Sequence, residues 1–259
     1  MLPVSKFSKP LWFVSMTLVY MFLYAPVCVL VLYSFNKGGF PDIWRGFSLQ
    51  WYDSLFDSVA IWRAFKHSAI VGLTSSFLSV AMALLWVHGA RRYKHDVTAI
   101  FYSNAMIFDI VLAVGLLALF SYLSIPFGLT TIIAGHTLLG LGFTIPVIKS
   151  RYDELDESLI EASLDLGAST QYTFFNVIIP FLYPALLSAF LLAMIVSFDD
   201  FLIAFFCSGA SVQTLSLYIF SMIRSGITPM VNALSALLLL GSLSMVMIML
   251  MLQRNVLRK

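Results

Sequence analysis

The sequence predicts an all-α, polytopic membrane protein with six transmembrane helices. Of its 259 residues, 60% are hydrophobic and only 11% are charged, and the mean hydropathy is +0.93. A soluble domain is about half apolar and about a quarter charged. Because a soluble fold could not bury this much apolar surface, we expect the bilayer to surround most of the chain. The net charge of +2 does not indicate nucleic-acid binding.

Six stretches meet the requirement of roughly 20 mainly apolar residues for a helix that crosses a bilayer. They are residues 11–34, 67–89, 98–123, 129–148, 181–206 and 231–252, which we interpret as one transmembrane domain over 1–259. The runs are too long and too uniformly apolar for barrel strands, which alternate. Run 11–34 follows Lys6 and Lys9 as a signal peptide would, but its length and the lack of a small-residue cleavage site predict a retained helix.

The basic residues predict the orientation. If the amino terminus lies inside, Lys and Arg are twice as frequent in the inner segments as in the outer ones, which predicts that both termini are cytoplasmic. The outer loop 36–66 carries several aromatic residues, which favour an interfacial helix with an aromatic belt over a ligand contact. These residues are Trp44, Trp51, Tyr52 and Trp62.

The longest inner loop, 149–179, is predicted to hold two short helices. Ser158 and Glu161 have the spacing of a capping box that would start the first helix. Gly167 is placed to end that helix in a left-handed turn. Either Ser169 or Thr170 can cap the second helix, which would run to Pro180 at the start of the next span.

The surface of this loop indicates a protein partner. Leu159, Ala162 and Leu166 share one side of the first helix. Six carboxylates make the loop acidic, so it would gain nothing from an anionic membrane surface, and a protein partner is the better explanation. They are Asp153, Glu154, Asp156, Glu157, Glu161 and Asp165.

The same loop resembles the EAA loop of ABC importer permeases. The match comprises Glu161-Ala162-Ser163, then Gly167, then an apolar stretch that ends at Pro180. Ser163 departs from the alanine usual in that family, and Val177 and Ile179 replace the usual isoleucine and leucine. The resemblance implies a coupling helix that docks into a groove of an ATP-binding subunit, with Glu161, Ala162, Ser163, Gly167 and Pro180 as coupling residues. The alternative interpretation is an ordinary amphipathic connector.

Further segments along nearly the whole chain are similar to the permeases of spermidine and putrescine importers, above all to the C-type subunit. They include Phe22 to Pro26, Tyr33 to Asn36, Gly46-Phe47 with Trp51-Tyr52, Phe108 to Ile110, Ser150-Arg151, Ser197 to Asp200 and Val231 to Leu234. The pattern departs at Phe108, at Gly209-Ala210 and at Met230. Met230 stands where an acidic residue is common, so a possible cation-attracting charge is missing.

This resemblance implies a type I ABC importer permease fold in a bacterial inner membrane. It also implies three partners: a dimer of ATP-binding cassette subunits, a homologous second permease and a periplasmic polyamine-binding protein. The chain itself would bind no cofactor, because ATP and Mg would be bound by the partner ATPase.

Three carboxylates, Asp109, Asp199 and Asp200, lie inside apolar runs. An aspartate at mid-bilayer costs about 3 kcal/mol, so these residues should face a bundle interior or a wet cavity. At about 1.5 Å per residue, Asp109 would lie about 17 Å from the inner surface and Asp199 about 28 Å. A flexible polycation needs such separated acids, with aromatic faces for cation–π contact. Asp109, Asp199, Asp200, Asn232 and Phe198 are therefore our candidates for a substrate path.

Alternatives remain for these polar residues. Asp199 and Asp200 point about 100° apart on a helix, so one would face the path while the other pairs with a neighbour or caps a break. Asp109 could instead bond to Ser103 or Asn104. For His136, a hydrogen bond between helices is favoured over a proton relay.

The sequence contains no P-loop motif, and its histidines show no zinc-ligand or Ser/His/Asp spacing, which disfavours an enzyme. The remaining rivals are an ABC permease for another small solute and a secondary cation transporter. The second is disfavoured by the acidic loop and by the lack of a visible inverted repeat.

Overall fold

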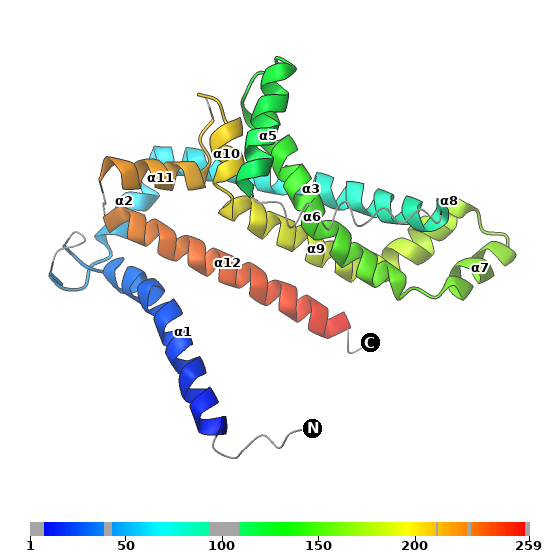
Figure 1. The fold of residues 1–259 in the computed structure, drawn as a ribbon, viewed down its shortest axis with the longest axis horizontal. Helices are drawn as coiled ribbons and strands as arrows, with labels where there is room; N and C mark the ends of the chain where they lie inside the picture. The colour runs from blue at the N-terminus through cyan, green and yellow to red at the C-terminus, as the bar shows by residue number, and fades with distance from the viewer. Residues whose placement is uncertain (1–7, 39–42, 94–108, 211, 227–228, 257–259) are drawn as a thin grey trace. The chain divides into compact units, whose positions relative to one another are not determined.

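The computed structural model describes residues 8–38, 43–93, 109–210, 212–226 and 229–256 (Figure 1). These residues form helices and no strand; one isolated β-bridge joins Asn36 to Phe47. The helices are α1 (Ser8–Tyr33), α2 (Gln50–Phe56), α3 (Val59–Tyr93), α5 (Asp109–Tyr122), α6 (Leu129–Asp153), α7 (Glu157–Asp165), α8 (Thr170–Thr173), η1 (Phe174–Ile178), α9 (Ile179–Asp199), α10 (Leu202–Cys207), α11 (Leu215–Ser225) and α12 (Pro229–Val256). The all-α prediction is confirmed.

Five of the described helical segments are long and apolar enough to cross a membrane. They are Trp12–Tyr33, Val59–Arg91, Leu129–Asp153, Thr170–Asp199 and Pro229–Met251. For the predicted span 98–123, the structure describes the shorter apolar helix α5, while residues 98–108 lie outside the described ranges. Five segments agree in location with predicted spans, and the sixth span stays a prediction.

Two boundaries differ from the predicted ones. Helix α3 begins at Val59 rather than near residue 67, because its buried stripe of Ile61, Ala64 and Ser68 continues the helical period while charged residues between them stay exposed. The predicted span 181–206 is interrupted, because α9 ends at Asp199 and α10 begins at Leu202.

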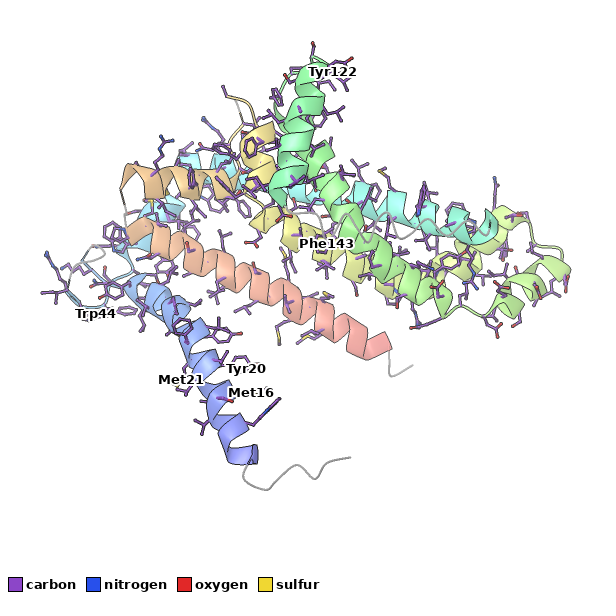
Figure 2. The ribbon with its side chains drawn as sticks, viewed as in Figure 1. Met16, Tyr20, Met21, Trp44, Tyr122 and Phe143 are labelled. Atoms are coloured by element: carbon purple, nitrogen blue, oxygen red, sulfur yellow. The ribbon has the colours of Figure 1, made fainter. Side chains whose placement is uncertain are left out.

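The chain divides into two compact units. The first comprises residues 1–59 and 221–241, and the second comprises 60–220 and 242–259. In the first unit, Trp51 Nε1 donates to the carbonyl of Asn36 at 2.8 Å, and the Tyr52 hydroxyl lies 2.7 Å from Ser34 Oγ. These aromatic side chains fasten α2 to the end of α1. Figure 2 shows Met16, Tyr20 and Met21 projecting from α1, where all three are exposed.

In the second unit, α6 packs along α9, and the two helices lie side by side in Figure 1. A small residue also lets α6 approach α3 closely. At Gly140 of α6, a Cβ atom would lie 2.4 Å from Ser79 Oγ of α3. Ser79 Oγ in turn donates to the carbonyl of Thr137 at 2.9 Å. Small residues and interhelical hydrogen bonds of this kind hold helices together where lipid removes the hydrophobic driving force.

Candidate functional site

The N-cap of helix α7 lies two residues before Ser158, where the predicted capping box begins. This N-cap is Asp156, whose carboxylate accepts a hydrogen bond from the Ser158 amide at 2.9 Å. The prediction that Ser158 caps this helix is therefore wrong. A carboxylate has two acceptor oxygens and a charge that the helix N-terminus favours, so Asp156 is the stronger cap of the two.

The Asp156 cap gives the loop a defined dependence on pH. Hydrogen bonds from the backbone and then the side chain of Ser158 hold the pKa of Asp156 below its usual 3.8. Because the folded pKa is depressed, the cap stabilises α7 above pH 3.8 and is lost as the pH falls through the lower folded value. We expect hydrogen exchange of the Ser158 amide, corrected for intrinsic rate, to accelerate below pH 3.8. In Asp156→Asn the exchange should lack this step.

The end of α7 is the left-handed turn that the sequence predicts. Gly167 has φ +84°, its amide donates to the Leu164 carbonyl at 2.9 Å, and the Ala168 amide donates to the Ser163 carbonyl at 3.1 Å. This is a Schellman motif. The second helix is capped by Ser169, whose hydroxyl accepts from the Tyr172 amide at 3.2 Å, so the choice between Ser169 and Thr170 is resolved.

Ser163 joins the two short helices. Its hydroxyl lies 2.9 Å from Oγ1 of Thr173, which is buried. The alanine usual in the EAA loop could not make this contact. The departure at Ser163 therefore adds a polar bond between α7 and α8.

From Thr170 the chain stays helical as far as Asp199, through α8, η1 and α9. The segment η1 is a π-helical turn, in which the Ile179 amide donates to the Phe174 carbonyl. Pro180 occupies the second position of α9, where its missing amide hydrogen is tolerated. The predicted position of Pro180 at the start of this span agrees with the structure, in which η1 joins α8 to α9 directly.

The two faces of α7 differ. Leu159 and Leu166 lie on one face and are 51% and 90% exposed, and no residue of α7 is buried. At 100° per residue, Glu157, Glu161 and Leu164 point about 140° to 160° away from Leu159, and Ile160 points about 100° away. The structure thus separates Glu161 from the apolar face, although the resemblance groups it with Ala162 as a docking residue. The docking role of Glu161 stays a prediction.

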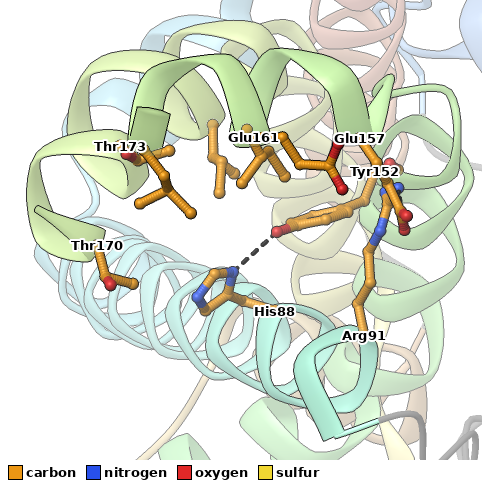
Figure 3. A pocket seen from close by; sticks show the side chains of 10 residues that line it. His88, Arg91, Tyr152, Glu157, Glu161, Thr170 and Thr173 are labelled. Carbon is orange, nitrogen blue, oxygen red and sulfur yellow. Dashed lines mark hydrogen bonds and ion pairs between the residues drawn. The ribbon is translucent and has the colours of Figure 1, made fainter. Parts of the chain in front are cut away.

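On the Glu161 side, α7 faces the end of α3 across a cavity of about 300 Å³ (Figure 3). Arg91 of α3 donates to the carbonyls of Tyr152 and Leu155 and lies 3.3 Å from a carboxylate oxygen of Glu157. His88 Nδ1 lies 2.8 Å from the Tyr152 hydroxyl. We call these contacts of Arg91 the Arg91 clasp. Sequence reasoning missed it, because Arg91 and Tyr152 are far apart in sequence and only the packing of α3 against α6 brings them together.

A second polar cluster lies where α9 breaks. His136 of α6 has Nδ1 2.6 Å from Ser197 Oγ and Nε2 3.2 Å from Asp200 Oδ2. The His136 and Asp200 side chains are only 1% and 5% exposed. The Asp200 carboxylate lies off the line of an Nε2–H bond, so the contact is an ion-pair distance rather than an aligned hydrogen bond. The hydrogen bond between helices that the sequence favours for His136 is present.

Asp200 also stabilises the break itself. Its carboxylate accepts from the Ala204 amide at 3.1 Å at the start of α10, and its carbonyl accepts from Ser216 Oγ at 2.8 Å. Of the two adjacent acids, Asp200 therefore pairs with a neighbour and caps the break, as one of the alternatives predicts. Asp199 remains exposed at the end of α9.

The other candidate path residues are less connected. Phe198 packs on α3, where a Cβ on Gly72 would lie 2.9 Å from its ring, and its ring centroid is 6.3 Å from that of Phe65. Asp109 is exposed at the start of the described part of α5, and Asn232 is half-buried in α12. Phe108, Ser103 and Asn104 lie outside the described residues. The role of these residues in a substrate path stays a prediction.

Comparisons with known proteins extend over most of the chain. It is 35% identical over 237 residues to the spermidine/putrescine transport system permease protein PotC of Haemophilus influenzae, covering 90% of this chain and 92% of the relative. It is 34% identical to PotC of Escherichia coli K12, over 89% of each chain. It is also 34% identical to the putrescine transport system permease protein PotI of the same strain, over 92% and 88%. The chain matches no protein-family model.

The fold is that of known transporter subunits. A bacterial alginate ABC transporter in complex with its periplasmic protein matches with a TM-score of 0.70 at 15% identity, covering 96% of this chain and 94% of the other. A chain of the methionine ABC transporter MetNI matches with a TM-score of 0.57 at 19% identity, over 76% and 94%.

Proposed function

The chain belongs to the family of spermidine/putrescine transport system permease proteins, and from this premise we propose that it is a membrane-spanning subunit of an ATP-driven polyamine importer. It would form half of the translocation path and perform no chemistry itself. A dimer of separate ATPase subunits would bind ATP and Mg, and a periplasmic binding protein would deliver the amine. Both termini would lie in the cytoplasm.

One observation supports the coupling role above all. Helix α7 buries none of its residues, exposes Leu159 and Leu166 on one face, and ends in the left-handed turn at Gly167. An exposed apolar face on a short helix whose two ends are fixed by a cap and a turn is suited to docking into a groove of another protein. Because α8 continues without interruption into α9, force applied to α7 would reach the break at Asp200.

The acids at the break support a cationic cargo. Asp200 is engaged by His136 and by the Ala204 amide, whereas Asp199 is exposed. The exposed carboxylate would offer a polyamine one ammonium partner, and Phe198 and Phe201, which are close to it in sequence, are candidate aromatic faces. Asp109 would provide a second carboxylate deeper in the membrane.

The test is reconstitution of the complete transporter. The chain should co-purify with an ATPase pair and a second permease, and proteoliposomes holding ATP should accumulate radiolabelled spermidine or putrescine when the binding protein is outside. Removing ATP should stop the uptake. Accumulation without any ATPase would contradict the proposal in favour of a secondary transporter. ATP hydrolysis with uptake of a different solute would contradict the polyamine assignment alone.

A further inference from the structure

The cavity beside α7 lies on a different side of this helix from Leu159 and Leu166. Its walls are α7 on one side and the ends of α3 and α6 on the other, as Figure 3 shows. At 100° per residue, the residues that line it from α7 point about 100° to 160° away from Leu159. A volume of about 300 Å³ lies at the lower end of the range of roughly 300–1,000 Å³ for small-molecule pockets.

The charge of the cavity favours a cation. Arg91 is engaged by two backbone carbonyls and by Glu157, so its charge is already compensated. Glu161 has no ion pair or hydrogen bond to any other residue that the structure describes. Among the carboxylates of the lining, Glu161 therefore lacks a cationic partner within the described residues, and an ammonium group could supply one.

The rest of the lining favours an alkyl chain. Ile160, Leu164 and Ile178 present aliphatic surface, and the Thr170 hydroxyl offers an acceptor. We propose that this cavity is a binding site for a small primary alkylammonium ion, with its ammonium at Glu161 and its methylenes against these aliphatic side chains. The inference rests on the proposed function in one respect, because an importer of amines would release its cargo on the side where α7 lies.

A cysteine placed in the wall measures occupancy directly. In a Cys28→Ser background, which removes the exposed native cysteine and leaves the buried Cys207, Leu164→Cys puts a thiol at the cavity. The full chain in phosphatidylcholine nanodiscs is treated with neutral methyl methanethiosulfonate, with or without butylammonium. At about ten times its dissociation constant, the amine should slow modification about tenfold by mass action.

Matched variants separate this site from other effects. Leu166→Cys, on the opposite and highly exposed face, should show no protection, and Glu161→Gln should abolish the protection of Leu164→Cys. Butanol should not protect. Asp199→Asn should retain full protection although the proposed function predicts that it loses uptake, so the two ideas fail separately.

Two results would overturn the proposal. The first combines two findings. Butylammonium leaves the modification rate of Leu164→Cys unchanged, and calorimetry on the chain with native Leu164 detects no butylammonium binding that Glu161→Gln would remove. The second is protection without added amine in nanodiscs that contain phosphatidylethanolamine, which would assign the site to a lipid headgroup instead of a free amine.

Discussion

Uptake of spermidine and putrescine is expected to fall about 10- to 150-fold in Asp199→Asn, since a hydrogen bond to a charged group contributes about 1.5–3 kcal/mol and each 1.4 kcal/mol is a factor of ten. Asp199 is exposed at the end of α9, where its carboxylate can meet an ammonium group. Initial uptake rates in proteoliposomes of assembled transporter measure the effect. Asp199→Glu, which keeps the charge, should retain most of the rate.

The adjacent acid provides a contrasting variant. Asp200→Asn would leave His136 buried without its carboxylate partner and would weaken the cap on the Ala204 amide. We therefore expect a lower melting temperature of the complex, which Asp199→Asn should not show. Unchanged uptake in a fully assembled Asp199→Asn transporter would remove this residue from the path.

The second large effect is expected at Gly167. Its φ of +84° is costly for a side chain with a Cβ, by about 1–2 kcal/mol for an ordinary residue and more for a β-branched one. No atom lies within 4 Å of a Cβ built there, so the cost is conformational and not steric. In Gly167→Val the turn between α7 and α8 should change, and uptake per ATP hydrolysed should fall several-fold.

Gly167→Asn is the matched control, because asparagine tolerates the left-handed region better than other residues with a Cβ. It should retain most of the coupling between hydrolysis and uptake. The measurement is the ratio of amine accumulated to phosphate released, with the binding protein present. If Gly167→Val kept the wild-type ratio, the left-handed turn would not be part of the coupling element.

The sequence predicts those elements that depend on residues close together in the chain, such as the membrane spans and the turn at Gly167. The long apolar runs predicted the spans because bilayer thickness sets a length, and Gly167 predicted its turn because few residues adopt a positive φ. The cap of α7 was assigned to Ser158 rather than Asp156, since a capping box and a carboxylate cap compete within three residues. Such competition is decided by backbone geometry that the sequence does not specify.

For tertiary contacts, the sequence indicated that polar residues such as His136 and Asp200 need partners, but it did not identify those partners. The break at Asp200 lies inside an apolar run, and it is stabilised by His136 from α6 and Ser216 from α11. The Arg91 clasp likewise depends on two helix ends that meet only in the fold. In each case a polar side chain appeared unpaired in sequence because its partner lies more than fifteen residues away.

The π turn in η1 sets how the short helices α7 and α8 are rotated relative to α9. A π turn accommodates one residue more than an α-helix would over the same rise. The surplus residue rotates everything beyond it by about 100° relative to an uninterrupted helix. A single deletion between Phe174 and Ile178 would thus produce a regular helix and turn the α7–α8 corner through roughly a quarter of a circle about the axis of α9.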